Sequence, residues 1–231
     1  MPQWGMVIDL DRCTGCGACA AACQSENNVP VVSREEAQMG RSLGWVHMVH
    51  EVEGTFPNVR VKSYPRICMH CEKAPCTYVC PVHATYVAED GIVAQIYPQC
   101  IGCRYCMAAC PYTVKTFNWY EPDWSEDLRK ARNPDVSLRP KGVVEKCTFC
   151  SHRLQKAREQ ARAESRPLRD EDYQPACVEV CPADAMVFGD LEHELSEVAE
   201  LAHSPRAEKL LEDLGTEPKV IYLRSRGGHE G

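Results

Sequence analysis

Two four-cysteine runs lie back to back in the stretch CMHCEKAPCTYVCPVHATYVAEDGIVAQIYPQCIGCRYCMAACP, residues 68–111. The runs are Cys68, Cys71, Cys76 and Cys80, then Cys100, Cys103, Cys106 and Cys110. Each run ends in a Cys-Pro pair, at Pro81 and Pro111. The spacing is nearly the same in both, except that Glu72 to Pro75 lengthen the gap before the third cysteine of the first run.

The other eight cysteines form two similar quartets towards the two ends of the chain. They are Cys13, Cys16, Cys19 and Cys23, then Cys147, Cys150, Cys177 and Cys181. The last quartet is opened in its middle by residues 151–176 and again ends in a Cys-Pro pair. All 16 cysteines of the chain therefore belong to four quartets.

This spacing favours iron-sulfur chemistry. A run of the form C-x2-C-x2-C-x3-C-P is typical of bacterial ferredoxins, in which three cysteines hold one 4Fe-4S cluster and the fourth binds the neighbouring cluster. Four such runs predict four 4Fe-4S clusters. Metal ligation would then supply much of the free energy of folding.

Two other uses of cysteine remain as alternatives. Structural zinc commonly joins two separated C-x2-C pairs, and the fourth quartet alone has that appearance. A disulfide framework is typical of secreted proteins, and these runs are too regular for one. Zinc would make the chain a structural module without redox function.

If the fourth cysteines cross over as in two-cluster ferredoxins, each cluster has three ligands from one run and one from another. The predicted ligand sets are Cys13, Cys16, Cys19 and Cys181; Cys68, Cys71, Cys76 and Cys110; Cys100, Cys103, Cys106 and Cys80; and Cys147, Cys150, Cys177 and Cys23. Full cysteine ligation leaves no open iron position. We therefore expect electron transfer and no catalytic residue in this chain.

Histidines beside the cysteine loops are interpreted as hydrogen-bonding neighbours and not as ligands. His70, His83 and His152 have such positions, while His47 and His50 lie in a strand-like stretch. No Gly-rich nucleotide loop or catalytic triad stands out.

The fold class predicted from these patterns is α+β, with two interleaved bacterial-ferredoxin-like modules, an inserted β-hairpin and a C-terminal helical tail. Met6–Leu10 is an apolar, β-prone stretch, and residues 45–64 have the pattern of a hairpin. Asp90-Gly91 is a typical turn between two short strands. A basic helix is predicted over Ser151–Ser165, with Leu154, Ala157 and Ala161 as its apolar stripe.

The predicted organisation has five parts. They are an outer module of residues 1–23 plus 141–190, an inserted segment 24–67, a central module 68–111, an aromatic and charged connection 112–140, and a C-terminal part 191–231. We expect the rings of Phe117, Trp119, Tyr120 and Trp124 either to cover the clusters or to form an interface, where Trp and Tyr are enriched.

The C-terminal part is predicted to contain a helix over residues 191–203 and a second over residues 204–215, with Ser204 as its N-cap. A last strand is predicted at residues 219–223, followed by a disordered tail from Arg224. We expect the clusters to assemble without the residues after Asp190.

Charge and hydropathy restrict the partners. The net charge is −7, so nucleic acid is not an expected partner. No signal peptide is apparent, and no apolar run reaches the roughly 18 residues of a membrane helix. We expect no direct membrane span, so any membrane association would be through a partner.

The order of the quartets, with the Glu72–Pro75 gap and motifs such as CIGCRYCMAACPY (residues 100–112) and GVVEKCTFC (residues 142–150), resembles one family over about residues 5–190. It is similar to the four-cluster iron-sulfur subunits of complex iron-sulfur molybdoenzymes, which include the dimethyl sulfoxide, polysulfide, thiosulfate, tetrathionate and arsenate reductases. Nitrate reductase-like members have Trp at one cysteine of the third quartet. Cys103 is present here, which indicates the all-4Fe-4S type.

The resemblance implies two partners, a catalytic subunit with a molybdenum or tungsten pterin cofactor and a polytopic membrane subunit that exchanges electrons with quinone. It also implies export with a partner that bears a twin-arginine signal, to the outer face of the membrane, with the cytoplasmic face as the alternative. Related alternatives are the iron-sulfur subunit of a quinol-oxidising complex or of a hydrogenase, or a free-standing polyferredoxin. Electrons are expected to pass through the quartets in the order one, two, three, four or the reverse.

Overall fold

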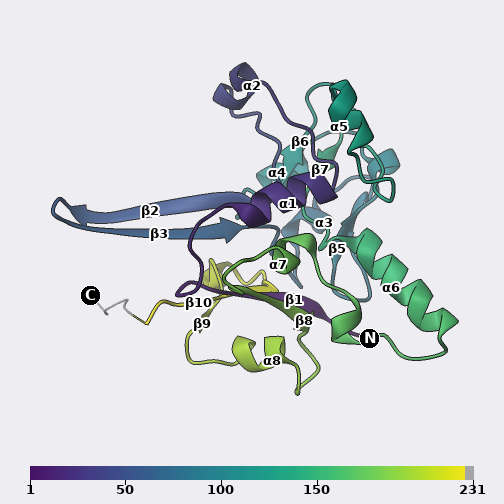
Figure 1. Ribbon diagram of the computed structural model, residues 1–231. Helices are drawn as coiled ribbons and strands as arrows, with labels where there is room; N and C mark the ends of the chain where they lie inside the picture. The colour runs from purple at the N-terminus through teal and green to yellow at the C-terminus, as the bar shows by residue number, and fades with distance from the viewer. Residues whose placement is uncertain (227–231) are drawn as a thin grey trace.

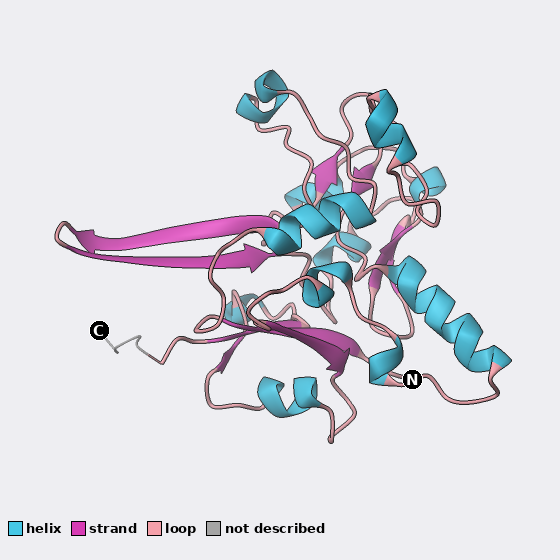
Figure 2. Cartoon of the chain, viewed as in Figure 1, coloured by secondary structure: helices cyan, strands magenta, loops and turns pink. Residues whose placement is uncertain are grey.

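A four-stranded mixed sheet places an N-terminal strand beside a strand from the C-terminal part of the chain (Figures 1 and 2). The computed structural model describes residues 1–226. The strand order is β8 (Met186–Asp190), β1 (Trp4–Asp9), β10 (Val220–Leu223) and β9 (Ala207–Glu208). β1 is antiparallel to β8 and parallel to β10, and it is buried along almost its whole length. The apolar, β-prone N-terminal stretch is thus confirmed as a strand, and it is an inner strand of the sheet.

β2 (His47–Thr55) and β3 (Asn58–Arg66) form a long two-stranded hairpin that projects from the rest of the molecule (Figure 1). Its far end is exposed, and Phe56 at the tip has 91% of its surface accessible. Its near end is anchored because the ring of Tyr64 packs edge-on against Tyr222 of the sheet, with 5.5 Å between ring centroids. The hairpin is therefore an arm attached at its base.

Most of the cysteines lie in or beside four short helices that pack in two pairs, and Cys147 and Cys150 directly precede the longer helix α6 (Ser151–Ala163). α1 (Ala18–Glu26) contacts α7 (Ala176–Glu179), and α3 (Pro75–Tyr78) contacts α4 (Tyr105–Ala108). Two further ladders, β4 (Thr85–Val87) with β5 (Val93–Gln95) and β6 (Thr116–Phe117) with β7 (Val144–Glu145), are antiparallel. The predicted turn at Asp90-Gly91 is confirmed between β4 and β5, where Gly91 has φ 78°.

The remaining helices lie around these elements. They are α2 (Arg34–Gln38), α5 (Glu126–Lys130), α6 (Ser151–Ala163), α8 (Glu197–Ala202) and the 3-10 turns η1 (Tyr97–Gln99), η2 (Asp170–Asp172) and η3 (Glu212–Leu214). α6 confirms the predicted basic helix, because Leu154, Ala157 and Ala161 are its buried residues. No helix among residues 1–226 has the length and apolar character needed to cross a bilayer.

The prediction of a second helix over residues 204–215 was wrong. Ala207 and Glu208 form strand β9 against β10, and Leu211 has φ 51°, which an α-helix does not allow. Ser204 and Gly215 are sound local start and stop signals, but backbone pairing with the sheet edge overrides helix propensity here. The C-terminal part is consequently a helix followed by two strands.

The expected disorder of the tail was wrong for Arg224–Arg226, and residues 227–231 lie outside the described part. The backbone N–H of Arg224 donates to the carbonyl of Arg206 over 2.9 Å, and that of Arg226 donates to the Asp11 carboxylate over 3.1 Å. Arg206 also forms an ion pair with Asp9 over 2.7 Å. These contacts connect residues 224–226, directly and through Arg206, to Asp9 and Asp11.

The segment before β10 also packs against the central cysteines. The N–H groups of Glu72 and Lys73 donate to the carbonyls of Glu217 and Thr216 over 2.9 and 3.1 Å. The part of the chain after Asp190 therefore contributes both β9 and β10, two of the four strands of the sheet, and a support for the Cys71 loop. We now expect truncation after Asp190 to destroy the fold, contrary to the expectation from sequence.

Candidate metal centres

The sixteen thiols are free and gather into four sets, each named after the quartet that supplies three of its cysteines. The first set is Cys13, Cys16, Cys19 and Cys181; the second is Cys68, Cys71, Cys76 and Cys110; the third is Cys100, Cys103, Cys106 and Cys80; the fourth is Cys147, Cys150, Cys177 and Cys23. In each set the thiols are near enough for their charges to interact. Every set thus combines three cysteines of one run with one from another.

The first set surrounds a small cavity at the base of the hairpin. The four cysteines line this cavity together with Met48 and Pro65 of β2 and β3. Burial and the neighbouring thiols raise the pKa of Cys19 to about 11. Cys16 is exposed, and the N–H of Ala18 at the start of α1 lowers its pKa. One edge of this set is therefore accessible from outside.

The second set lies deeper and also surrounds a cavity, which Tyr112 and Lys115 help to line. Burial and the charge of Cys68 raise the pKa of Cys71 to about 12. The hydroxyl groups of Tyr112 and Thr216 share a hydrogen bond of 2.6 Å next to this thiol. The C-terminal segment therefore closes one side of the second set.

The fourth set is wholly buried and has polar hydrogens directed at its sulfur atoms. The side-chain amide of Asn27 donates to Cys23 Sγ and Cys150 Sγ, each over 3.6 Å, and the N–H of Phe149 donates to Cys147 Sγ over 3.4 Å. Burial raises the pKa of Cys23 well above its usual value. Such donors stabilise sulfur in its anionic form, which is the form that binds metal.

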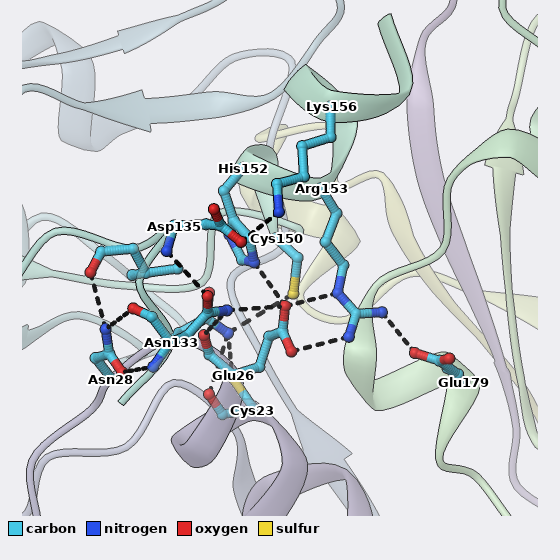
Figure 3. A network of polar contacts seen from close by, with 12 residues as sticks. Cys23, Glu26, Asn28, Asn133, Asp135, Cys150, His152, Arg153, Lys156 and Glu179 are labelled. Atoms are coloured by element: carbon cyan, nitrogen blue, oxygen red, sulfur yellow. Dashed lines mark hydrogen bonds and ion pairs between the residues drawn. The ribbon is translucent and has the colours of Figure 1, made fainter. Parts of the chain in front are cut away.

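A polar network next to the fourth set joins α1 to α6 (Figure 3). Glu26 accepts hydrogen bonds from Arg153 over 2.7 and 2.8 Å, and its Oε1 lies 2.6 Å from Nε2 of His152. Hydrogen bonds from Arg153 and then His152 lower the pKa of Glu26 to about 2, although burial acts against them. The basic residues of α6 are thus used in part to fix the helix that carries Cys23.

The third set is again partly exposed. The N–H of Ala84 donates to Cys80 Sγ over 3.2 Å, while Cys103 is accessible at the surface. The guanidinium of Arg104, the next residue, lies 4.6 Å from the ring centre of Trp119 and 5.4 Å from that of Phe117. The aromatic connection therefore packs beside this set.

The sets are adjacent in the order first, fourth, second, third. Burial and the thiols around Cys177, including Cys19 of the first set, raise the pKa of Cys177. Burial and Cys68 of the second set raise the pKa of Cys147 to about 12. The expected order one, two, three, four was wrong, because interleaving puts the last run of the sequence between the first two.

The donor sets fit iron-sulfur clusters. Each offers four thiols, and backbone or amide N–H groups point at sulfur atoms of several of them. A zinc ribbon would need Cys181 next to Cys147, Cys150 and Cys177, whereas Cys181 lies beside Cys13 and Cys19. Among residues 1–226, no group of three His, Cys, Asp or Glu side chains is compact enough for a single metal ion.

His70, His152 and His50 have contacts with groups other than the sixteen thiols. His70 is fully buried, its Nδ1 accepts the N–H of Val93 over 3.1 Å, and its ring stacks on Phe149 at 3.8 Å. His152 contacts Glu26, and His50 Nδ1 lies 2.8 Å from Ser63 Oγ. These three have polar partners, as expected from sequence.

The aromatic connection is divided between core and surface. Trp119 is half-buried and Tyr120 is 53% exposed, and both line a groove of about 220 Å³ with Val31 and Leu43. Arg41 lies over Trp119, with 5.0 Å to the ring centre. Trp119 thus packs beside the third set, as expected for rings that cover the clusters, while the alternative role of these rings in an interface stays a prediction.

Sequence reasoning missed several buried charged residues near the sets. Lys115 and Lys146 are buried, and so is the ion pair of Arg139 and Glu145, whose atoms are 2.8 Å apart. Their only signal was a charged residue inside an otherwise apolar stretch next to cysteines. Their burial depends on how the modules pack, which no local pattern reveals.

Comparison with known proteins identifies the cluster-binding segments. Models described as 4Fe-4S dicluster domains match residues 59–126 and residues 99–205, and one described as a 4Fe-4S binding domain matches residues 4–25. Together these matches cover all four cysteine runs.

Several curated proteins are similar to this chain over almost its whole length. It is 52% identical to the iron-sulfur cluster-binding subunit of menaquinone reductase from Nitratidesulfovibrio vulgaris, over 97% of this chain and 89% of that one. It is 37% identical to the arsenate respiratory reductase iron-sulfur subunit of a Shewanella species, over 96% and 97% of the two chains. It is 35% identical to a polysulfide reductase subunit from Wolinella succinogenes, over 99% and 98%.

Proposed function

Since the chain belongs to the family of 4Fe-4S electron-transfer subunits of the dimethyl sulfoxide, polysulfide, arsenate and tetrathionate reductases, we propose that its sixteen cysteines hold four clusters in one relay. The first to fourth sets are the proposed ligand sets. When bound, each cluster takes up and releases one electron at a time. The number four and the assignment of each ligand belong to this proposal.

The observation that carries the proposal is the difference in exposure between the two sets at the ends of the order and the two sets between them. The first and third sets are at the two ends of the order, and each has an exposed cysteine, Cys16 and Cys103. The fourth and second sets lie between them, and Cys150 and Cys71 are 5% and 7% exposed. This suits a relay that exchanges electrons at its ends and excludes water from its middle.

The residues of the chain have distinct tasks in such a relay. The thiols fix the positions of the clusters, and N–H donors such as those of Ala84 and Phe149 stabilise the anionic sulfur ligands. The buried aromatic pair of His70 and Phe149 keeps water out between the second and fourth sets. No acid-base or nucleophilic step is required of any side chain.

Two partner subunits complete the proposal. One is a catalytic subunit with a molybdenum or tungsten pterin cofactor, and the other is a polytopic membrane subunit that binds quinone. The names of the similar arsenate and polysulfide reductase subunits support a reductase complex of this kind. The substrate would be set by the catalytic partner.

A pair of cysteine variants tests the ligand sets. We expect Cys103→Ser to alter one cluster and to leave the other three assembled, because Cys103 lies at an exposed end. Cys23→Ser should alter the cluster of Cys147, Cys150 and Cys177. Iron and sulfide analysis with EPR of the reduced protein gives the readout, with about sixteen irons expected in the unmodified chain. Damage by Cys23→Ser to the cluster of Cys13, Cys16 and Cys19 alone would contradict the crossover.

A menaquinone reductase complex is a second candidate. The 52% identity to the menaquinone reductase subunit of Nitratidesulfovibrio vulgaris favours it. Both candidates use the same relay, but they differ in whether quinone receives the electrons. Purification of the intact complex, followed by molybdenum and tungsten analysis and by assays of menaquinone reduction and menaquinol oxidation, separates them. Rapid menaquinone reduction without oxyanion or polysulfide reduction would favour the second candidate.

We also propose that the complex holds this chain at the outer face of the membrane, after export with a twin-arginine partner. The cytoplasmic face is the alternative. Protease treatment of intact spheroplasts would degrade the exposed hairpin around Phe56 in the first case and leave it intact in the second.

A further inference from the structure

Two buried lysines lie beside the second set without an acidic partner. Lys146 is fully buried and Lys115 is 5% exposed. Lys146 Nζ donates to the carbonyls of Val93 and of Cys147, and Lys115 Nζ lies 3.4 Å from Thr85 Oγ1 and from Gln95 Oε1. Among the described residues, no carboxylate lies within 4.0 Å of either ammonium group.

A buried charge of this kind is costly unless an opposite charge is close. The other deeply buried cations show the usual solution, because Arg139 pairs with Glu145 and Lys219 pairs with Glu72. The hydrogen-bond acceptors around Lys115 and Lys146 are neutral. Compensation must therefore come from another anion nearby, and the thiolate ligands are the nearest candidates.

The two lysines stand at the two junctions of the second set. Lys115 lines the cavity of that set, and its charge acts on Cys76 as well as on Cys80 and Cys106 of the third set. Lys146 acts on Cys76 and also on Cys147 of the fourth set. Cys76 of the second set is the thiol that both charges reach.

We propose that Lys115 and Lys146 are tuning residues that raise the reduction potential of the cluster bound by the second set, with smaller effects on the third and fourth sets respectively. This inference rests on the four-cluster relay proposed above. A cluster held by four thiolates is anionic and becomes more negative on reduction, and its potential depends on local charge. A fixed positive charge therefore favours the reduced form. Two such charges beside one cluster would make it the preferred resting place of an electron within the relay.

The test is an EPR-monitored redox titration of the intact complex with neutral variants Lys115→Gln and Lys146→Gln. Each should lower the midpoint potential of the second-set cluster by about 59 mV, which is a tenfold change for one electron. Lys115→Gln should also lower that of the third-set cluster, and Lys146→Gln that of the fourth-set cluster. Only the second-set cluster should respond to both changes.

The matched control is the double change Lys219→Gln and Glu72→Gln, because it acts at a similarly buried lysine, at 7% exposure, but removes both members of an ion pair and leaves the local net charge unchanged. It should leave the potentials close to those of the unmodified protein. Equal shifts in the two lysine variants and in this control would overturn the proposal, as would unchanged potentials in the Lys115 and Lys146 variants with full iron content.

Variants that fail to assemble are informative as well. If a Gln variant loses iron, the charge-preserving Lys→Arg change at the same position decides the case. Iron retained with Arg supports a requirement for the charge, and iron lost with both changes overturns the proposal by showing a role in shape alone. Fewer than four clusters in the unmodified protein would instead contradict the proposed relay, so the two failures are distinguishable.

Discussion

The cysteine loops of the first and third sets, at the ends of the order, share a backbone conformation with those of the second and fourth sets, which lie between them. Different residues adopt that conformation in the two groups. In each run, the residue just before the second cysteine has a left-handed backbone. It is Gly15 with φ 69° and Gly102 with φ 70° in the first and third runs, but His70 with φ 43° and Phe149 with φ 51° in the second and fourth. Glycine adopts this conformation freely, whereas for other residues the left-handed backbone costs about 1–2 kcal/mol of conformational energy.

The surroundings explain the difference. A Cβ at Gly102 would lie 2.4 Å from the carbonyl oxygen of Gly142, and one at Gly15 would lie 2.6 Å from Cβ of Ser63 in the hairpin. In the inner loops the His70 and Phe149 rings stack on each other and are fully buried. Burial of a large apolar side chain contributes about 1.5–3 kcal/mol, enough to offset the strain. The glycines of the end loops thus leave room for a neighbouring segment, and the buried rings of the inner loops exclude water from the middle of the proposed relay.

Truncation after Asp190 should have the largest effect, because it removes the support of an inner cysteine loop as well as part of the sheet. The deletion removes β10 from the sheet and the segment that supports the Cys71 loop, including the bond from Lys219 N–H to the carbonyl of Met69, 2.9 Å long. We expect loss of the folded state and of all clusters, read by circular dichroism and iron content. Truncation after Arg226 is the control and should retain both. An intact inner cluster in the shorter protein would show that the C-terminal part does not support that loop.

Replacement of Phe149 tests whether strain is stored in the inner loops. Phe149→Ala should cost about 3–5 kcal/mol of unfolding free energy, because the ring leaves a cavity beside His70 and Phe188. Phe149→Gly should be the more stable of the two by about 1 kcal/mol, since φ is positive. At Leu154, inside helix α6, the order should reverse, with Gly about 1 kcal/mol worse than Ala. Chemical denaturation of the four variants gives the free energies of unfolding. If the Gly variant is less stable than the Ala variant at both positions, the backbone at Phe149 is not strained.

Alanine at the end-loop glycines should separate backbone strain from steric clash. Gly17→Ala should cost about 1–2 kcal/mol, because Gly17 has φ 77° and nothing lies within 4 Å of a new Cβ. Gly102→Ala should cost more than that, since the Gly142 carbonyl must also move, and it should weaken the third-set cluster. Urea unfolding and iron retention provide the measurement. If the two changes lower the free energy of unfolding equally, the backbone around Gly142 moves away from the new Cβ at no energetic cost.

The smallest expected effect concerns Glu26, whose network supports the inner fourth set from outside. Its pKa is lowered from 4.5 to about 2 in the folded protein, so its ionised form contributes stability above pH 4.5 that is lost as the pH falls towards 2. Glu26→Gln should therefore cost roughly 1 kcal/mol or less near neutral pH, because water screens this partly exposed ion pair. The difference from the unmodified protein should shrink below about pH 4.5. A difference that does not vary between pH 7 and pH 3 would exclude the ion pair with Arg153 as its source.

Much of the chemistry could be predicted from the sequence because it is encoded locally. The x2 spacings, such as that between Cys100 and Cys103, bring ligands to one side of a loop whatever surrounds them, so the cysteine runs alone indicated iron-sulfur binding. The turn at Asp90-Gly91 and the stripe of Leu154, Ala157 and Ala161 were equally local, and the structure confirms both elements. The family matches agree with this interpretation.

The tertiary structure decided what depends on contacts between distant segments. It determined that the fourth set lies between the first and the second, that residues 207–208 form a strand and not a helix, and that Lys115 and Lys146 are buried without an acidic partner. Ligand spacing acts over a few residues and is visible in the chain itself. Adjacency, burial and charge compensation arise only when segments more than a hundred residues apart, such as β1 and β10, pack together and exclude water.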